Sequence, residues 1–354
     1  SLLLDPQWGV VQGDAEVVSR LRAGGAVLVG KTATLEFAIG FADPEKPFPI
    51  HRNPWNAERW PGGSSAGSGA GVAAGMCLGA IGTDTGGSIR IPAAFCGISG
   101  LKATYGRVPG RGCVPLGYSL DHIGPMARSA ADCAAMFGSM ADWRAEEPAF
   151  GADDLRTDLE GITIGVDRVH HPAPDSPAAV NVDPTSVEAF EQSLVDLEAL
   201  GATIKEIELP LFAEASMADI VIMVCEAMSY HRMDFQQRWT EYGTQTRRVL
   251  GWSIAFSAAD YVQAQRVRRA TGRRLAAMFD QGGLDAIVHP TSLFGAPVVD
   301  GAGIEDWFDW PIFTGYGNSV GLPVLSVPMG LSSDEMPVGL SVMTAAHDEF
   351  GALG

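Results

Sequence analysis

The sequence predicts an α/β protein with a large, mixed, twisted central sheet that helices cover on both faces. The main observation is that short apolar runs, typical of buried strands, alternate with helical segments along the whole chain. Such interleaving favours a largely parallel or mixed sheet with both faces covered. The 354 residues are 46% hydrophobic and 19% charged, which is the composition of a globular chain with ample core.

Caps and glycines mark the helices. The first predicted helix begins at the N-cap Asp14 and ends at Gly24. Another begins at Asp183, with Pro184 in its first turn, and ends at Gly201. The remaining predicted helices are residues 65–75, 129–141, 213–239 and 258–281. The predicted strands are residues 26–29, 78–81 (a short central strand), 162–166, 203–207, 286–288, 324–327 and 338–342.

Charge and composition exclude several classes of partner. The chain carries 42 acidic and 24 basic side chains, a net charge of -18, which repels nucleic acid and anionic membranes. No run of about 18 apolar residues predicts a transmembrane helix, and the first residues do not resemble a signal peptide. The five cysteines are odd in number, widely spaced and without a CxxC pair, so they do not predict a disulfide framework. A reducing, cytoplasmic location is therefore expected. Because neither cysteines nor histidines have metal-ligand spacing, no metal or other cofactor is expected.

Three short motifs suggest other chemistry, but their contexts argue against it. Residues 25–32, GAVLVGKT, match the phosphate-loop pattern, yet a predicted strand occupies the positions of the loop. Ser65 stands at the centre of GSSAG, a nucleophile-elbow pattern, but a proline-containing loop precedes it where a strand is required. Residues 99–102, SGLK, match SxxK, although Gly97 and Gly100 disfavour the helix that this motif needs.

A larger constellation combines two glycine-rich turns. One is PGGSS, residues 61–65, and the other is TDTGGS, residues 83–88, which Arg90 follows. Flexible glycines in TDTGGS let consecutive backbone N–H groups converge beside a serine hydroxyl, as an oxyanion hole requires. Ser88 is therefore a candidate nucleophile, and Ser64 is placed to pass on its proton. No histidine lies within either turn, so an amine is the alternative base.

At these residues the sequence resembles the amidase signature family of serine hydrolases, which is marked by GGSS, a small-residue helix and DxGGSxRxP. Residues 62–65 and 84–92 match these motifs. The likeness continues through GKTATLEFA at 30–38, GLKATYGRVP at 100–109 and NSVGLPVLSVP at 318–328, and covers nearly the whole chain. It implies the amidase signature fold and hydrolysis of a non-peptide C–N bond in an amide, anilide or carbamate.

The resemblance also implies a Ser-Ser-Lys triad. Ser88 would attack the carbonyl carbon, and Ser64, after a cis Gly63–Ser64 peptide bond, would relay a proton between Ser88 and a lysine. The oxyanion hole would use the N–H groups of Thr85, Gly86, Gly87 and Ser88. Supporting positions would be Ser65, Asp84 and Arg90. Ala38 falls where the acyl-site wall of the family lies, beside Phe37. Further candidates for substrate contact are Tyr118, Phe313 and Tyr316.

The lysine of this triad has no match in the sequence. The family places it in a strand before the first glycine-rich helix, and the four lysines of this chain lie elsewhere: Lys31, Lys46, Lys102 and Lys205. None is expected to be the base, which needs a buried amine with a pKa lowered from about 10.4 toward neutrality. We therefore expect residues 1–354 to be a single amidase domain without its N-terminal and C-terminal portions. Residues 145–182 are expected to be an excursion or insertion.

Three other functions stay open. The transamidating subunit of an aminoacyl-tRNA amidotransferase shares these motifs, and an α/β-hydrolase would use Ser65. A non-catalytic amidase-like binding protein is the third, if the lysine is absent. The expected partner is a small-molecule amide or carbamate, with no nucleic acid and no membrane, and a homodimer is left open.

Overall fold

The structure, a computed structural model, describes residues 13–41, 43, 49–143, 155, 156, 158–170, 181–299, 310 and 312–354. The helices and strands of these residues are α1 (Glu16–Ala23), α2 (Ala66–Ala73), β1 (Gly79–Asp84), α3 (Arg90–Cys96), β2 (Ser99–Lys102), β3 (His122–Ala127), α4 (Ala130–Met140), β4 (Thr163–Asp167), α5 (Pro184–Ala199), β5 (Thr203–Ile207), α6 (Phe212–Gln237), α7 (Thr244–Trp252), α8 (Ala258–Asp280), β6 (Ala286–Pro290), α9 (Gly315–Val320), β7 (Val324–Leu331), β8 (Pro337–Thr344) and α10 (Glu349–Leu353).

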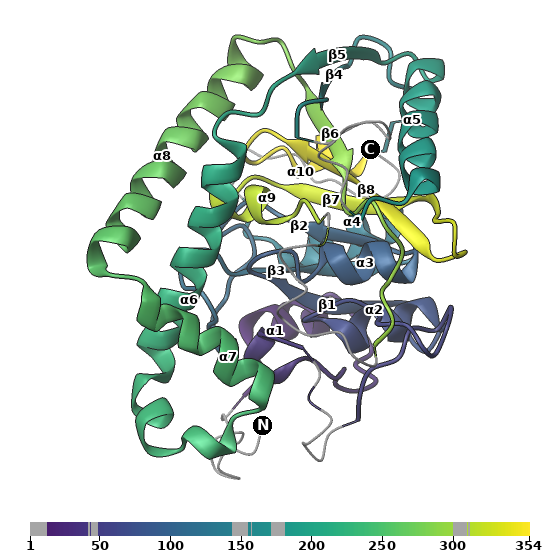
Figure 1. The fold of residues 1–354 in the computed structure, drawn as a ribbon. Coiled ribbons are helices and arrows are strands. Elements are labelled where there is room, and N and C mark those ends of the chain that lie inside the picture. The colour runs from purple at the N-terminus through teal and green to yellow at the C-terminus, as the bar shows by residue number, and fades with distance from the viewer. Residues whose placement is uncertain are drawn as a thin grey trace.

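Eight strands form one mixed sheet in the order β1-β3-β2-β7-β8-β6-β4-β5 (Figure 1). Neighbouring strands are antiparallel, except that β4 runs parallel to both β5 and β6. The mixed sheet that the sequence predicts is therefore confirmed. Within the described sheet β1 is an edge strand, so the prediction of a central strand at residues 78–81 is wrong in its position.

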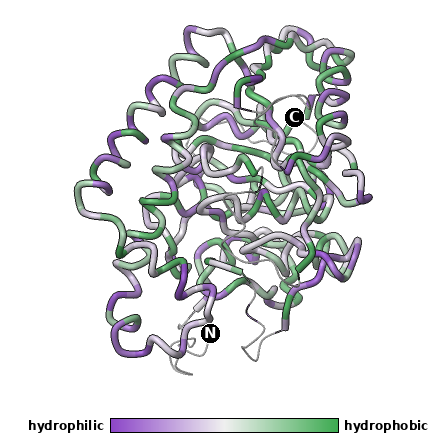
Figure 2. Tube along the Cα trace, in the orientation of Figure 1, coloured by the Kyte–Doolittle hydropathy of each residue, from purple (hydrophilic) through white to green (hydrophobic). Residues whose placement is uncertain are grey.

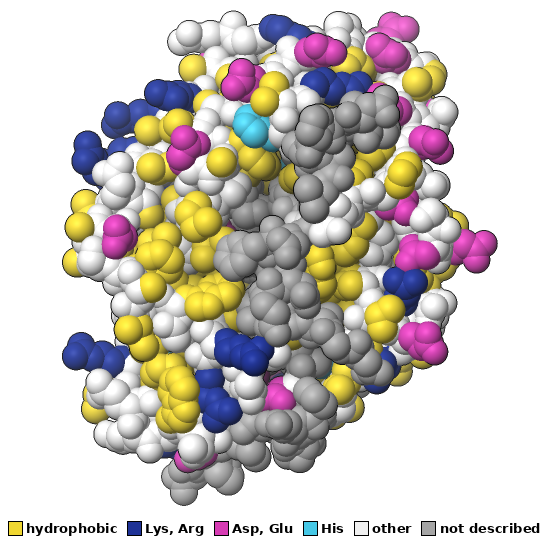
Figure 3. Space-filling model, in the orientation of Figure 1, with side chains coloured by type: hydrophobic (Ala, Val, Ile, Leu, Met, Phe, Trp, Pro, Cys, Tyr) yellow, Lys and Arg dark blue, Asp and Glu magenta, His cyan; other side chains and the backbone are white. Residues whose placement is uncertain are grey.

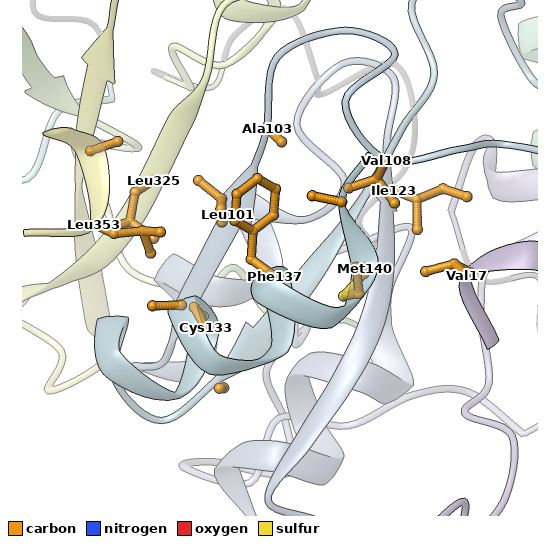
Figure 4. Close-up of a cluster of buried hydrophobic side chains, with 14 of the residues drawn as sticks. Val17, Leu101, Ala103, Val108, Ile123, Cys133, Phe137, Met140, Leu325 and Leu353 are labelled. Carbon is orange, nitrogen blue, oxygen red and sulfur yellow. The ribbon is translucent and has the colours of Figure 1, made fainter. Parts of the chain in front are cut away.

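Helices cover both faces of the sheet. Successive residues of a strand point to opposite faces, and on β7 they meet different helices. Leu325 packs with Phe137 of α4 and Leu353 of α10 (Figure 4), whereas Val324 packs with Leu275 of α8. In Figure 2 α8 alternates between hydrophilic and hydrophobic residues, as expected for a helix with one exposed side.

Most of the predicted elements are confirmed, and the best marked is α5. The side chain of its N-cap Asp183 accepts a hydrogen bond from the Ser186 N–H at 2.8 Å. The elements that the prediction missed are short or contain glycine or proline: α3, β2, β3, α7, α9 and α10. The expected excursion at residues 145–182 lies largely outside the described residues, although β4 falls within it.

Two local predictions near the N-terminus are wrong. Residues 26–29 are not a buried strand: Val27 and Val29 are 86% and 78% exposed, and the segment pairs with no strand of the described sheet. An apolar run indicates hydrophobicity but does not show whether a partner strand lies beside it. Asp14 does not cap α1: the N-cap residue is Ala15, and the carboxylate of Asp14 pairs with Arg22 at 3.0 Å.

Small residues let α2 approach the chain that precedes it. The Gly67 N–H donates to the Ala33 carbonyl oxygen at 2.9 Å. A Cβ atom at Gly67 would lie 2.6 Å from the backbone nitrogen and oxygen of Ala33, whereas one at Gly71 would meet only Cys77 Sγ, at 3.9 Å. The close contact fixes the start of α2, which directly follows the turn that carries Ser64.

Replacing Gly67 by alanine should therefore destabilise the protein, because the added methyl group cannot avoid the backbone of Ala33. We expect the free energy of unfolding to fall by about 1–3 kcal/mol. Gly71→Ala on the same helix is the matched control and should be neutral or stabilising by about 0.5–1 kcal/mol, since alanine favours helix. Urea unfolding measures both, and equal effects of the two substitutions would contradict the close approach.

Candidate active site

The two glycine-rich turns lie against each other beside one cavity of about 340 Å³. The Ser65 N–H donates to the Ser88 carbonyl oxygen at 3.3 Å and joins the turns. The Gly63–Ser64 peptide bond is cis. Ser64 and Ser88 both line the cavity, so the fold brings together the two serines that the sequence analysis singled out.

Asp84, the last residue of β1, organises the second turn. Its side chain is fully buried. Oδ1 accepts a hydrogen bond from the Gly87 N–H at 2.7 Å, and Oδ2 accepts one from the Ile89 N–H at 3.1 Å. Two N–H groups on either side of Ser88 are thereby held by one carboxylate, which fixes the backbone that presents the serine.

Arg90 pairs with this carboxylate from the first turn of α3. Its Nε and one terminal nitrogen each lie 3.0 Å from an oxygen of Asp84. The other terminal nitrogen donates to the Thr314 carbonyl oxygen at 3.0 Å. Asn318 of α9 donates to Asp84 Oδ1 at 2.7 Å and also contacts Arg90. The ion pair therefore joins β1, α3 and α9 at the cavity.

Two opposing effects set the charge of Asp84. Burial alone would raise the pKa of its carboxyl group, but the Arg90 guanidinium and the more distant Lys102 outweigh burial and hold the pKa well below its usual value. Asp84 is thus a carboxylate at neutral pH. A buried charge of this kind is stable only because it is paired and accepts several hydrogen bonds.

The residues predicted for the oxyanion hole differ in what they contact. Thr85 and Gly86 line the cavity together with Ser88. The Gly87 N–H is instead engaged by Asp84, and the φ angle of +130° at Gly87 is one that side chains rarely allow. Hydrogen bonds at 2.6 Å anchor the turn further, from Thr314 Oγ1 to the Gly86 carbonyl oxygen and from Thr85 Oγ1 to Asp121.

Ser65, the serine of the nucleophile-elbow pattern, has a different environment. Its hydroxyl accepts a hydrogen bond from the Thr83 N–H at 3.0 Å and lies 3.2 Å from the Thr83 carbonyl oxygen. The side chain is buried and does not line the cavity. The Ser65 hydroxyl therefore helps to hold the backbone of the TDTGGS turn, and it does not face a substrate in the cavity.

Ser64 and the lysines do not meet in the described part of the chain. Ser64 Oγ is buried and has no hydrogen bond to any described group. Lys102 is fully buried on β2, and its amine donates to the Leu322 carbonyl oxygen and lies 3.4 Å from His122 Nε2. Its hydrogen bonds to described groups include none to Ser64 or Ser88. Lys31 and Lys205 are exposed, and Lys46 lies outside the described residues.

Lys102 nevertheless has one property that the base of a Ser-Ser-Lys triad would need. Burial, helped by the nearby positive charge of Arg90, lowers the pKa of Lys102 to about 7. Lys102 is thus a buried amine with a pKa near neutrality, but its hydrogen bonds go to groups other than Ser64, so the expectation that it is not the base stays a prediction. No periodic pattern marks the position, because Lys102 ends a four-residue strand that contains Gly100.

The cavity wall is mostly apolar. Ala38 and Phe313, two of the substrate-contact candidates, line it. The other three do not: Phe37 packs on His231 and Tyr242, Tyr118 is half exposed beside Tyr230, and Tyr316 is buried against Phe212. Lining residues that the sequence analysis missed include Trp60, Asp219, Ile220, Met223 and Trp252.

Comparison with known families identifies this arrangement. A family model described as Amidase matches residues 9–353. The chain belongs to the amidase family. The predicted resemblance and the predicted amidase signature fold are both confirmed, since the solved structures that resemble this amidase include members of the same family.

Three relatives illustrate the range of the similarity. A glutamyl-tRNA(Gln) amidotransferase subunit from Symbiobacterium thermophilum is 38% identical over 93% of this amidase and 72% of the relative. The crystal structure of the corresponding subunit from Thermotoga maritima has a TM-score of 0.82 and 32% identity, covering 96% of this amidase and 75% of that chain. The peptide amidase of Stenotrophomonas maltophilia gives 0.73 and 30%, with 96% and 74% covered.

The described residues provide neither a membrane span nor a metal cluster. None of their helices is both long enough and apolar enough to span a bilayer. No three histidine, cysteine or acidic side chains among them are grouped so that they could hold a metal ion.

Replacing Lys102 by methionine should change how stability depends on pH. Between about pH 7 and 10 the unfolded chain keeps a proton on this amine that the folded chain releases. The free energy of unfolding of the wild type should therefore rise with pH relative to Lys102→Met, by up to about 1.4 kcal/mol per pH unit. Urea unfolding at about pH 7, 8 and 9 measures this, with the exposed Lys205→Met as the control. A difference that stays constant with pH would contradict the shifted pKa.

Proposed function

We propose that this amidase is the catalytic subunit of an aminoacyl-tRNA amidotransferase that releases ammonia from a carboxamide through an acyl-enzyme on Ser88. The observation that carries the proposal is the likeness, over nearly the whole chain, to glutamyl-tRNA(Gln) amidotransferase subunits. The placement of Ser88 beside the cavity and next to a fixed glycine turn supports the same chemistry. We therefore prefer the transamidating alternative to the simple hydrolysis that the motifs first suggested.

In the proposed reaction, Ser88 Oγ forms a bond to the carbonyl carbon of the amide. Ser64 relays the proton of Ser88 through the base to the leaving nitrogen, and the C–N bond breaks to release ammonia. The acyl group stays on Ser88 as an ester. Water then adds to this ester, and loss of Ser88 Oγ gives a carboxylic acid and regenerates the serine. The ammonia is the nucleophile that an amidotransferase supplies to its second substrate.

The N–H groups of Thr85 and Gly86 are the proposed donors to the negative oxygen that forms during attack. Both residues line the cavity, whereas the Gly87 N–H already donates to Asp84. A donor of this type is typically worth about 100- to 1,000-fold in rate. The proposed role of Asp84 and Arg90 is therefore to hold the turn in position without touching the substrate.

The proposed base is a lysine outside the described residues. Ser64 Oγ is buried without a hydrogen bond to a described group, and buried hydroxyl groups normally have a partner. An amine at Ser64 would satisfy this hydroxyl and would accept the proton of Ser88. Lys102, although its pKa lies near 7, is hydrogen-bonded elsewhere.

The surface charge is compatible with a tRNA substrate, although the net charge of -18 led us to expect no nucleic acid partner. On the face drawn in Figure 3 basic side chains gather at the upper left, over α8. The exposed arginines of this helix are Arg266, Arg269, Arg273 and Arg274. The surface of this helix is therefore locally basic, although the net charge of the chain is negative. Arginine side chains bind phosphate groups well, so this surface could contact a tRNA backbone.

A second candidate function is hydrolysis of an apolar amide, anilide or carbamate without a tRNA. The observation that favours it is the cavity wall, which includes Phe41, Trp60, Met223, Trp252 and Phe313. Such a wall would bind an aromatic or aliphatic acyl group through burial of apolar surface, at about 25 cal/mol per Å². Glutamine, the usual nitrogen donor in transamidation, is much more polar.

Substitution of the serines tests the proposed nucleophile. Ser88→Ala should lower ammonia release by about 1,000-fold or more. Ser64→Ala should cause a comparable loss, because removal of one member of a catalytic unit can cost nearly as much activity as removal of the whole unit. Ser65→Ala is the control and should keep most of the activity. Loss of activity in Ser65→Ala with full activity in Ser88→Ala would support the α/β-hydrolase alternative instead.

Substrates separate the remaining functions. Ammonia release from glutamine that amidates Glu-tRNA(Gln), in complex with partner subunits, supports the amidotransferase. Turnover of apolar amides by the isolated amidase, with no amidation of tRNA, supports the second candidate. If a fluorophosphonate fails to label Ser88 in a chain that contains the lysine, the protein is a non-catalytic binding protein.

A further inference from the structure

An acidic side chain in the wall of the cavity has a buried oxygen that has no partner among the described groups. Asp219 belongs to α6, lines the same cavity as Ser64 and Ser88, and is only 2% exposed. Its Oδ1 atom is buried and has no hydrogen bond to any described group. Buried polar atoms without a partner are rare and costly, so this one calls for an explanation.

Asp219 borders the turn that carries Ser88. A Cβ atom placed on Gly86 would lie 3.3 Å from Asp219 Oδ2, and one on Gly315 would lie 3.6 Å from the same oxygen. The carboxyl group is therefore in contact range of the proposed oxyanion hole. A negative charge here would repel the oxyanion, unless a cation from the substrate compensates for it.

Two other buried acids, neither of which lines the cavity, have partners. Asp84 pairs with Arg90. Glu226, further along α6, accepts hydrogen bonds from the Ser119 hydroxyl and the Tyr261 hydroxyl, both at 2.8 Å. Asp219 alone among these three has a buried oxygen with no partner among the described groups, so its side chain does not serve to hold neighbouring elements together.

The charges around Asp219 leave it poorly compensated. Burial raises its pKa well above the usual value, and the carboxylate of Asp84 on β1 adds to this effect. Arg90 of α3, Arg268 of α8 and Lys102 of β2 act in the opposite direction but do not cancel it. Arg90 itself is bonded to Asp84, and Arg268 donates to the carbonyl oxygens of Ser319 and Ser119. A cation that entered the cavity would find Asp219 available.

We propose that Asp219 determines specificity by binding an ammonium group on the acyl part of the substrate, so that the preferred substrates are carboxamides of amino acids. This inference rests on the proposed acyl transfer at Ser88. The ammonium group would donate to Asp219 Oδ1, and the resulting ion pair would stabilise the carboxylate form of this side chain, which burial alone disfavours. The apolar remainder of the wall would bind the rest of the acyl group without offering it a second charge. Amides that lack the ammonium group would leave the buried carboxyl without a partner.

Binding to the Ser88→Ala variant tests the proposal with two matched pairs of compounds. L-Glutamine is compared with glutaramate, its deamino analogue, and phenylalaninamide with 3-phenylpropanamide. In isothermal titration calorimetry at neutral pH, the ammonium member of at least one pair should bind about 10- to 100-fold more tightly than its analogue. Adding Asp219→Asn should abolish this difference while leaving the affinity of the deamino compound unchanged or increased.

The control is Asp234→Asn, the same change at an exposed acid of the same helix, which should keep the preference. Thermal unfolding checks that the variants fold, and Asp219→Leu replaces Asp219→Asn if the latter does not fold. Equal affinity within both pairs, no binding of any of the four compounds, or an equal loss for both members of a pair in the Asp219 variant would overturn the proposal. Because binding needs no acyl transfer, a preference for ammonium compounds in a protein without amidase activity would refute the proposed function but not this inference.

Discussion

The buried ion pair between Asp84 and Arg90 is the interaction on which the rest of the site depends. Asp84 ends β1, Arg90 begins α3, and the Gly87 and Ile89 N–H groups between them donate to the same carboxylate. Asn318 adds a donor from α9, which is distant in sequence. Removal of one partner from a buried pair typically costs about 3–5 kcal/mol, because the other charge is left uncompensated. One carboxylate thus fixes the edge strand, the turn that carries Ser88 and two helices together.

The ion pair also explains how the N–H groups of the turn are divided. Gly87 donates inward to Asp84, and its positive φ turns the chain so that Thr85 and Gly86 face the cavity. In the proposed reaction, a rigid turn of this kind would provide preorganised donors that need no rearrangement. Within this bonded network, Ser64 Oγ and Asp219 Oδ1 have no partner among the described groups. We propose that the catalytic base is the missing partner of Ser64 Oγ and that the substrate is the missing partner of Asp219 Oδ1.

Most of the fold could be predicted from the sequence because long elements have strong local signals. The N-cap Asp183, Pro184 and the glycine at position 201 mark α5, and the alternation of strands and helices gives the mixed sheet. The strand predicted at residues 26–29 is wrong because an apolar run is also compatible with an exposed extended segment.

The candidate site could be predicted only in part. The paired turns at Ser64 and Ser88 could be found because the spacing of their glycines and serines is local. Asp219 could not be found, because the burial of one acid in a long helix depends on elements that are far away in sequence. The only signal was its position in the mostly apolar segment ADIVIMV.

The central claim is that Asp84 holds the turn around Ser88, and hydrogen–deuterium exchange of Asp84→Asn tests it most directly. If the carboxylate fixes the turn, the amides of Gly87 and Ile89 should exchange at least about 10-fold faster in the variant, while the amides of α5 keep their wild-type rates. Unchanged exchange at both amides in a folded Asp84→Asn protein would contradict the account.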